Sequence, residues 1–433
     1  MKRMTKLCIH ALLLLGTAAC SLLDSDHPGD TPRNGTERKD TVATADTVTT
    51  PPLPQYDTII YAAAVRYPTG YDWRIDTLTA EVQADVVLLR NGVVISSTPA
   101  SYENAVSADP DMHRIADGHI YTDYSSNYDT FIKKDGNLLF KYEGRERICG
   151  FYVDGGDVWT LGEARGRLGG VILRKNGNIV FESNEGHTFL NASDPSSDSG
   201  ALHFENGAPW FCYYTNEDGP LSNTNGCYIV ENGVSKKLEI PSTIRKIMDV
   251  KKIDGELVLA GVISSVFNAI SIVKGGLVVS ISLPASYQLA NCKIIPGNGG
   301  LFYLTGECTH YTANETAGYI YDSNGTCLYF TSGGQRLLGL YADGDCTALV
   351  SCNADGSSPS INLNGKIRTT PGTYRYLSAR CGRIFGDKFY MAYNPMDLDT
   401  PPFISDGTTI KALDLNGFIT DIKIMTVPKE VKK

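Results

Sequence analysis

Short runs of β-branched and aromatic residues, broken at regular intervals by Asn-Gly or Asp-Gly pairs, form the dominant pattern of this chain. Residues 170–182 show it most clearly: the apolar runs Gly170–Arg174 and Asn178–Glu182 flank Asn176-Gly177. Asn-Gly tolerates the positive φ angles of a tight type I′ turn. The pattern therefore predicts a β-hairpin at this point.

The same hairpin turn recurs along the chain. It is found at Asn91-Gly92, Asp135-Gly136, Asn176-Gly177, Asn232-Gly233, Gly275-Gly276, Asn324-Gly325, Asn364-Gly365 and Asp406-Gly407. Seven steps lead from residue 91 to residue 406, which gives a mean spacing of 45 residues. A repeat of roughly 40–50 residues built from short strands is typical of a β-propeller.

A second hairpin turn precedes the first within nearly every repeat. These turns lie at Asp117-Gly118, Asp154-Gly155, Asn206-Gly207, Asp254-Gly255, Asn298-Gly299, Asp343-Gly344 and Gly386-Asp387. Each repeat therefore predicts four strands, named a to d in chain order. Over about residues 56–427 this layout resembles WD40-type and kelch-like propeller blades, without their Trp-Asp or Gly-Gly signatures. Such a resemblance implies a fold and no function.

The two ends of the repeat predict how the ring closes. The first repeat opens directly on a b-strand, Tyr56–Val65, and the last is followed by a surplus strand, Phe418–Val427. We expect the surplus strand to serve as strand a of the first blade, since closure removes exposed sheet edges. The prediction is an all-β protein: an eight-bladed β-propeller over residues 56–433, with seven blades as the alternative.

The connections between strands predict a working face. In a four-stranded meander the a–b and c–d turns lie on one face, and the b–c and d–a connections lie on the other. The long connections all belong to the second, here called the long-loop face: residues 66–83, 98–110, 184–199, 215–225, 307–316 and 394–402. Long loops in compact folds usually carry function. We expect a ligand to bind there, around the mouth of the central channel.

Residues 1–19 have the pattern of an export signal. Lys2, Arg3 and Lys6 precede the apolar stretch 7–19, which is too short to span a bilayer as a helix. Thr17-Ala18-Ala19-Cys20 resembles a bacterial lipobox, although Thr17 stands where that family usually has Leu. The resemblance implies that Cys20 is lipidated and becomes the new N-terminus. A plain secretory signal cut after Ala19 is the alternative.

Residues 20–55 are poor in large apolar groups and rich in Thr, Asp and Pro, which predicts a flexible linker behind the lipid anchor. Ser21 and Asp24-Ser25-Asp26 resemble sorting signals of Bacteroidetes-type lipoproteins. The resemblance implies an outer-membrane location, on the periplasmic face or the cell surface. Asp40-Thr41-Val42 and Asp46-Thr47-Val48 match a pattern that is O-glycosylated in that group, or arise by chance in a Thr-rich linker.

Charge narrows the choice of partners. The net charge is −9, and loss of the three cations of residues 1–19 takes it to −12. Such an acidic chain argues against nucleic acid or anionic lipid as the main partner. The expected partners are the membrane, reached through the lipid anchor, and a glycan or protein on the long-loop face.

Aromatic residues are the candidate ligand contacts, because exposed Tyr and Trp bury much area with little loss of entropy. The candidates on the long-loop face are Tyr71, Trp73, Tyr102, Tyr124, Tyr128, Tyr214, Tyr311 and Tyr393. Trp73, in the longest b–c connection, is the strongest single candidate. The competing interpretation is that these rings pack between blades.

A carbohydrate-active enzyme is the alternative function, since acidic residues also gather on this face. They are Asp72, Asp76, Asp194, Asp198, Glu217, Asp218, Glu307, Asp397 and Asp399. Glycoside hydrolysis needs two carboxylates at a defined separation. The chain has no HExxH, Gly-x-Ser-x-Gly or Walker motif, and no metal or cofactor is expected. A non-catalytic binding or assembly module is therefore the first hypothesis.

Nine of the eleven cysteines remain after Cys8 leaves with the signal and Cys20 carries lipid. Cys212 and Cys227 fall on adjacent predicted strands and are the candidate disulfide. The absence of CxxC spacing argues against zinc or redox chemistry. The other cysteines are expected to be small buried side chains.

Overall fold

The structure is a computed structural model of the chain. It describes residues 56–72, 83–100, 113–126, 128–164, 169–189, 200–215, 226–263, 268–313, 315–331, 335–343, 346–353, 355, 357–370, 381–395 and 400–428. The chain divides into two units, Met1–Leu53 and Pro54–Lys433, and every described residue belongs to the second. The predicted signal, the lipidation site Cys20 and the linker lie outside the described residues. So do Trp73 and Tyr102.

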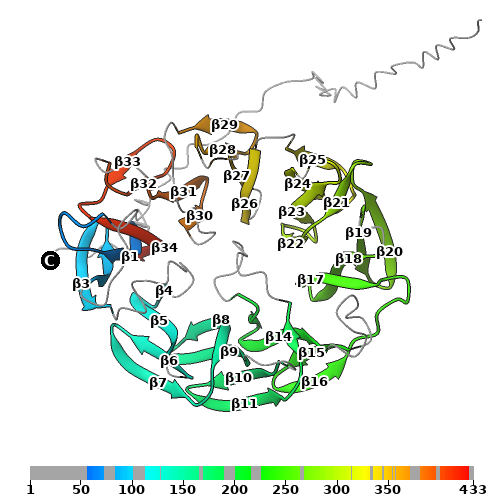
Figure 1. Cartoon of the computed structure of the whole chain (residues 1–433), viewed down its shortest axis with the longest axis horizontal. Helices are drawn as coiled ribbons and strands as arrows, with labels where there is room; N and C mark the ends of the chain where they lie inside the picture. Colours follow the sequence, from blue (N-terminus) through cyan, green and yellow to red (C-terminus); the bar gives the residue numbers. More distant parts are fainter. Residues whose placement is uncertain are drawn as a thin grey trace, which may run out of the picture. The chain divides into compact units, whose positions relative to one another are not determined.

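The second unit is an all-β ring of eight blades (Figure 1). Blade 1 contains β34 (Gly417–Pro428), β1 (Tyr56–Arg66), β2 (Asp85–Arg90) and β3 (Val93–Pro99), and blade 2 contains β4 (His113–Ala116), β5 (His119–Ser126), β6 (Asp129–Lys134) and β7 (Asn137–Tyr142). Blade 3 contains β8 (Glu146–Asp154), β9 (Asp157–Ala164), β10 (Val171–Lys175) and β11 (Asn178–Ser183). Blade 4 contains β12 (His187–Thr188), β13 (His203–Glu205), β14 (Ala208–Tyr214), β15 (Cys227–Glu231) and β16 (Val234–Lys237).

Blades 5 to 8 continue the same meander. Blade 5 contains β17 (Lys246–Ile253), β18 (Glu256–Val262), β19 (Ala269–Lys274) and β20 (Leu277–Ser282). Blade 6 contains β21 (Tyr287–Leu289), β22 (Lys293–Pro296), β23 (Phe302–His310), β24 (Thr316–Asp322) and β25 (Cys327–Phe330). Blade 7 contains β26 (Gln335–Asp343), β27 (Cys346–Asn353), β28 (Ser360–Leu363) and β29 (Lys366–Thr369), and blade 8 contains β30 (Gly382–Phe385), β31 (Lys388–Tyr393), β32 (Phe403–Ser405) and β33 (Ile410–Ala412).

The C-terminal strand closes the ring as predicted. β34 pairs antiparallel with β1 from Tyr56↔Pro428 to Arg66↔Gly417, and the order β3-β2-β1-β34 makes it the inner strand of blade 1. Its Ile419 and Ile422 are fully buried in a cluster that reaches into blade 8. The prediction of eight blades is thereby confirmed, and the seven-bladed alternative is wrong.

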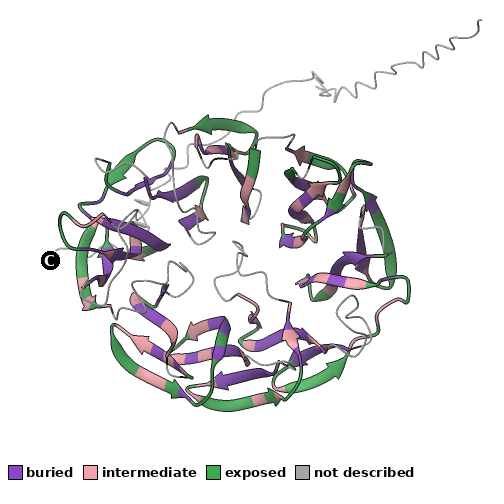
Figure 2. Ribbon diagram, in the orientation of Figure 1, coloured by how far each residue is buried: buried purple, intermediate pink, exposed green. Residues whose placement is uncertain are grey.

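The core lies between the blades, and burial falls from the inner and middle strands to the outer ones (Figure 2). The cluster between blades 5 and 6 illustrates this arrangement. It joins Ile270 and Ile272 of β19 to Leu304 of β23 and Tyr319 of β24, all at most 3% exposed. Each blade therefore packs against its neighbours through clusters of this kind, such as those between blades 8 and 1 and between blades 4 and 5.

The turn Asn and Asp residues do more than supply a positive φ angle. In the β10–β11 hairpin Asn176 has φ 51°, its N–H donates to the Val158 carbonyl at 2.7 Å, and its Oδ1 accepts the Val158 N–H at 2.8 Å. The same pair of bonds joins Asn91 to Ile60, Asp135 to Ile120 and Asn364 to Thr347. The turn side chain thus extends the hydrogen-bond ladder to strand b.

We expect Asn176→Ala to lower the free energy of unfolding by about 2 kcal/mol, because it adds left-handed strain and removes a bond to a part-buried N–H. Asn232→Ala is the matched control. Asn232 has φ 50°, close to the 51° of Asn176, but faces Pro209, which has no N–H to donate. Asn232→Ala should lower the free energy of unfolding by about 1 kcal/mol, through backbone strain alone. Equal losses in chemical denaturation would contradict the bridging role of the side chain.

The inner strands alternate around the ring in a way that the sequence pattern did not predict. Blades 1, 3, 5 and 7 have long inner strands with bulges at Thr420, Cys149, Met248 and Leu338. Within the described residues, the inner strands of blades 2 and 8 are four residues long, and those of blades 4 and 6 each consist of two short segments. After two of the bulges, Asp421 and Asp249 accept the backbone N–H groups of Ile115 and Ile294 in the following blade. The structural repeat is therefore a pair of blades.

One predicted loop is largely strand. Residues 307–316 were expected to be a long connection, but β23 continues to His310 and β24 begins at Thr316. Thr309 pairs with Thr316, and Cys308 opposite Ala317 is fully buried. These small side chains carry the buried face beyond the predicted strand end, so the hairpin is longer and its loop shorter than the polar residues suggested.

Candidate ligand-binding surface on the long-loop face

Two of the predicted contact residues serve the packing of the ring. Tyr393, at the end of β31, is 1% exposed and stacks on Phe403 with ring centroids 4.7 Å apart. Its prediction as a ligand contact is wrong, because its side chain fills the gap between blades 7 and 8. Tyr71 is half-buried against Tyr67, at 5.3 Å, and its carbonyl accepts a bond from Asn416 Nδ2 at 2.9 Å.

Tyr214 lies at the end of β14 between two other rings. The ring of Phe189 is 5.0 Å away and that of His187 is 5.7 Å away. Burial raises the pKa of the Tyr214 hydroxyl. Glu163 Oε1 lies 2.6 Å from His187 Nδ1 and orients the imidazole. Tyr214 is thus part of a half-buried contact between blades 3 and 4.

In blade 2, Tyr124 lies on β5 and Tyr128 lies in the turn between β5 and β6, both toward the long-loop end of these strands. Tyr124 stacks on its cross-strand partner Phe131, with ring centroids 5.1 Å apart and planes 16° apart. Tyr128, between the two strands, is 80% exposed and has φ 70°. Bulky residues rarely adopt this left-handed conformation. We call Tyr124, Tyr128 and Phe131 the blade-2 aromatic site.

Cations flank this aromatic site. Lys133 Nζ lies 5.1 Å from the Tyr124 ring centroid, and Lys141 Nζ lies 5.9 Å from that of Phe131. Asp129 holds Lys141 in place through an ion pair of 2.7 Å. The hydrogen bond from Lys141 lowers the pKa of Asp129, and that of Lys141 is raised in turn. The site therefore combines half-exposed rings with positive charge on an acidic protein.

The sequence analysis missed Phe131, Lys133 and Lys141. All three belong to β6 and β7, which the hairpin at Asp135-Gly136 had already placed in one blade. The strand register, which pairs Phe131 with Tyr124 and with Lys141, supplies the missing information. Tyr311 is 47% exposed but lies between β23 and β24 of blade 6, on a different blade.

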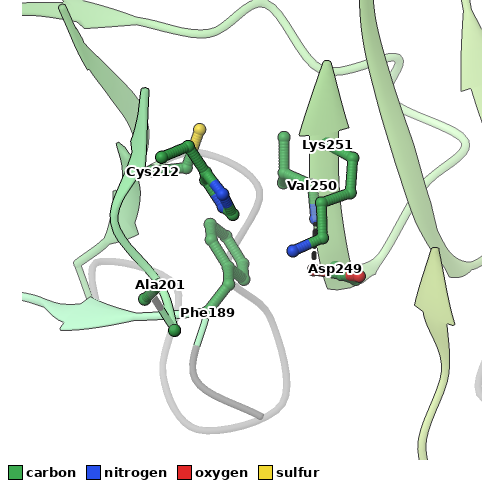
Figure 3. A pocket seen from close by; sticks show the side chains of 8 residues that line it. Phe189, Ala201, Cys212, Asp249, Val250 and Lys251 are labelled. Carbon is green, nitrogen blue, oxygen red and sulfur yellow. Dashed lines mark hydrogen bonds between the residues drawn. The ribbon is translucent and has the colours of Figure 1, made fainter. Parts of the chain in front are cut away.

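A small pocket opens between blades 4 and 5 (Figure 3). Phe189, Ala201 and Cys212 of blade 4 face Asp249 and Lys251 of β17 across it. The volume open to water-sized molecules is about 20 Å³, and one water needs roughly 10–15 Å³ by that measure. Asp249 already accepts the N–H groups of Val250 and Ile294. The pocket suits one ordered water and is too small for a sugar ring.

The two candidate acids within the described residues, Asp72 and Glu307, lie on different blades and do not form a pair. Asp72 follows β1 of blade 1, whereas Glu307 lies on β23 of blade 6 and bonds to Asn291. The other seven candidate acids, from Asp76 to Asp399, lie outside the described residues. Within the described part of the chain no three His, Cys, Asp or Glu side chains could hold a metal ion.

The predicted disulfide is not formed, because Cys212 and Cys227 are both free thiols. Register gives the reason. Cys212 pairs with Ile229 while Cys227 pairs with Tyr214, so the two cysteines are diagonal rather than opposite. Diagonal positions in a sheet lie about 7–8 Å apart, which is too far for a bridge. Burial raises the pKa of Cys227 to about 12, which disfavours the reactive thiolate form at neutral pH.

Comparison with known proteins adds distant structural likenesses. No protein-family model matches the chain, and no curated protein matches it. The dihydro-heme d1 dehydrogenase NirN is similar at 10% identity and TM-score 0.48, over 84% of this chain and 74% of that one. The β-propeller domain of the Trilobed protease from Pyrococcus furiosus is similar at 13% identity and TM-score 0.40, over 66% and 87%.

An oligogalacturonate lyase in complex with manganese is similar at 10% identity and TM-score 0.41, over 68% of this chain and 85% of that one. The likenesses thus include enzymes of different kinds, and identities this low assign no activity. Within the described residues no helix is long and apolar enough to cross a membrane. The strand topology establishes that the chain forms an eight-bladed β-propeller.

Proposed function

We propose that this protein is a lipid-anchored β-propeller of the bacterial outer membrane that binds a ligand without catalysis, and that the blade-2 aromatic site is its binding surface. The ligand class that fits best is a glycan. Sugar rings pack their apolar faces on exposed aromatic side chains, and the hydroxyls around them accept bonds from cations such as Lys133. A protein that inserts an apolar anchor is the competing ligand.

One observation carries the proposal: Tyr128 is 80% exposed in a left-handed conformation, in the turn between the two strands that carry the half-buried Tyr124–Phe131 stack. Backbone strain and solvent-exposed rings both oppose stability, and strained residues cluster at binding sites. Tyr393 and Tyr71 by contrast pack within the ring. Packing therefore accounts for those two rings, and the turn between Ser126 and Asp129 accounts for the φ angle of Tyr128, but neither explains why its ring is exposed.

Binding is tested with Pro54–Lys433 on a glycan array, followed by titration calorimetry with any glycan retained. Tyr128→Ala and Phe131→Ala should each weaken binding about tenfold or more, the loss of about 1.4 kcal/mol of ring contact. Tyr311→Ala removes an exposed tyrosine of blade 6 and should leave the affinity unchanged. Retention of no glycan, or equal losses in all three variants, would contradict the assignment of this site.

The anchor is tested separately on the full-length chain in a Gram-negative host. Metabolic labelling with an alkynyl fatty acid should mark the wild-type protein, and Cys20→Ala should remove the label and release the protein from the membrane fraction. Two or more acyl chains bind membranes stably, whereas the unacylated linker has no such affinity. A labelled Cys20→Ala variant would place the lipid elsewhere.

A further inference from the structure

An exposed connection, residues 143–145, joins β7 of blade 2 to β8 of blade 3 on the long-loop face. It is fixed to blade 2 by hydrogen bonds at its far end. Ser125 Oγ donates to the Glu146 carbonyl at 3.1 Å, and Thr130 Oγ1 accepts the Glu146 N–H at 2.9 Å. Ser125 and Thr130 adjoin, in the sequence, two rings of the blade-2 aromatic site. The connection therefore borders that site.

Two arginines flank Glu146 on this border. Arg145 and Arg147 are both exposed, and neither forms an ion pair with any other residue that the structure describes. The Glu146 carboxylate between them is taken by the buried Arg174, at 2.7 and 2.8 Å. Glu163, opposite Arg147 in the β8–β9 pairing, is occupied by bonds to both residues of β12. The two guanidinium groups are thus available to a ligand.

The surface around the blade-2 aromatic site is positively charged on an otherwise acidic chain. Lys133 and Lys141 flank the rings, and the two arginines add to them. Among the described residues at this end of blade 2, the acids that are not paired with a buried arginine are Asp129 and Glu143. Four cations and two acids give a local charge of 4 − 2 = +2, whereas the whole chain carries −9.

We propose that the glycan bound at the blade-2 aromatic site is acidic, and that Arg145 and Arg147 hold its carboxylate or sulfate groups. This inference rests on the proposed glycan-binding function of that site. Aromatic rings pack on neutral and acidic sugars alike, so the rings alone do not select between them. A guanidinium group donates two parallel hydrogen bonds to an oxyanion, and these charge-assisted bonds are about twice as strong as neutral ones. An acidic glycan therefore gains contacts that a neutral one lacks.

Arg147 has a counterpart on the other side of the ring. Arg336 lies two residues before the bulge in the inner strand of blade 7, as Arg147 does in blade 3. It too is exposed and forms no ion pair with a described residue. Blade 7 is opposite blade 3, far along the ring from the blade-2 aromatic site (Figure 1). Arg336 is therefore a matched control for the position of the charge.

The glycan class is tested by applying Pro54–Lys433 to an array of uronic-acid, sulfated and neutral hexose oligosaccharides of equal length. Acidic members should be retained. Titration calorimetry should show that removing the acidic group, by carboxyl reduction or desulfation of the same oligosaccharide, weakens binding about tenfold or more. Retention of the uronic-acid or of the sulfated members identifies which oxyanion the arginines hold.

The contact itself is tested with the retained oligosaccharide and three variants. Arg147→Gln and Arg145→Gln remove a charge and keep a polar side chain, and each should weaken binding about tenfold. Arg336→Gln removes the same charge from blade 7 and should bind like the wild type. Thermal unfolding of each variant shows that it remains folded.

Neutral glycans that bind as tightly as acidic ones, lose affinity in Tyr128→Ala and keep it in both blade-3 variants would overturn this inference and leave the proposed function standing. Retention of no glycan would refute both. Equal losses in Arg147→Gln and Arg336→Gln would mean that the ligand responds only to the overall charge of the protein, and would refute the contact with Arg147.

Discussion

A chain that ends at Asn416 should fail to fold cooperatively. It lacks β34, which supplies the inner strand of blade 1 and pairs with β1 over its whole length. Phe418, Ile419 and Ile422 are each at most 4% exposed. Burying each of these side chains is worth about 1.5–3 kcal/mol, and the total stability of a domain is about 5–15 kcal/mol. We therefore expect circular dichroism to show no sharp thermal transition in the truncated chain.

A chain that ends at Pro428 is the control, because it retains every pairing of β34. It should unfold like the full-length protein. Addition of a peptide that spans residues 417–428 to the truncated chain should restore part of the transition, since it fills the same gap in blade 1. A truncated chain that melts as sharply as the control would show that closure contributes little to stability.

Glu146→Met should destabilise the ring by about 3–5 kcal/mol, because it leaves the buried Arg174 guanidinium without its carboxylate. Arg174 donates two bonds to Glu146, of 2.7 and 2.8 Å, and the two side chains are 8% and 3% exposed. Arg174 also lies 4.1 Å from the ring centroid of Tyr142. Burial raises the pKa of Glu146 despite the opposing effect of Arg174.

The double variant Glu146→Met/Arg174→Met should lose much less than Glu146→Met alone, because two well-packed apolar chains replace a desolvated ion pair. A double-mutant cycle by urea denaturation measures this coupling. Lys175→Met is the control on the same strand: it breaks an ion pair with Asp157 whose side chains are 41% and 43% exposed. Such exposed pairs contribute about 0–1 kcal/mol. If Glu146→Met lowered the free energy of unfolding as little as Lys175→Met does, the buried ion pair would not have the importance that we assign to it.

The blade count and the closure could be predicted from the sequence because they depend on local signals. Asn-Gly turns mark hairpins directly, and unmatched strands at Tyr56–Val65 and Phe418–Val427 leave one way to pair. The alternation of long, bulged inner strands with short or split ones also has a signal in the sequence, which the sequence analysis missed. Gly-Phe-Tyr-Val-Asp-Gly at 150–155 and Gly-Leu-Tyr-Ala-Asp-Gly at 339–344 mark the bulged inner strands of blades 3 and 7.

The candidate site was less predictable because it depends on contacts between strands and blades. Tyr393 and Tyr128 both follow predicted b-strands, yet one is buried by the neighbouring blade and the other is exposed. Phe131 belongs to the site because it lies opposite Tyr124 in the β5–β6 pairing. The diagonal placement of Cys212 and Cys227 depended on register in the same way. A hydrophobic pattern fixes which residues alternate, but not which neighbour each one meets.

A disulfide engineered between Thr58 and Thr426 tests the closed ring most directly. The two residues are exposed Cα partners in the β1–β34 pairing, and directly opposite residues are about 4.5–5.5 Å apart, within reach of a disulfide. With the exposed Cys327 replaced by Ser, Thr58→Cys/Thr426→Cys should cross-link quantitatively on mild oxidation, as peptide mass mapping would show. Two thiols that stay reduced and reactive would mean that β34 does not lie beside β1, and the ring would not be closed as described.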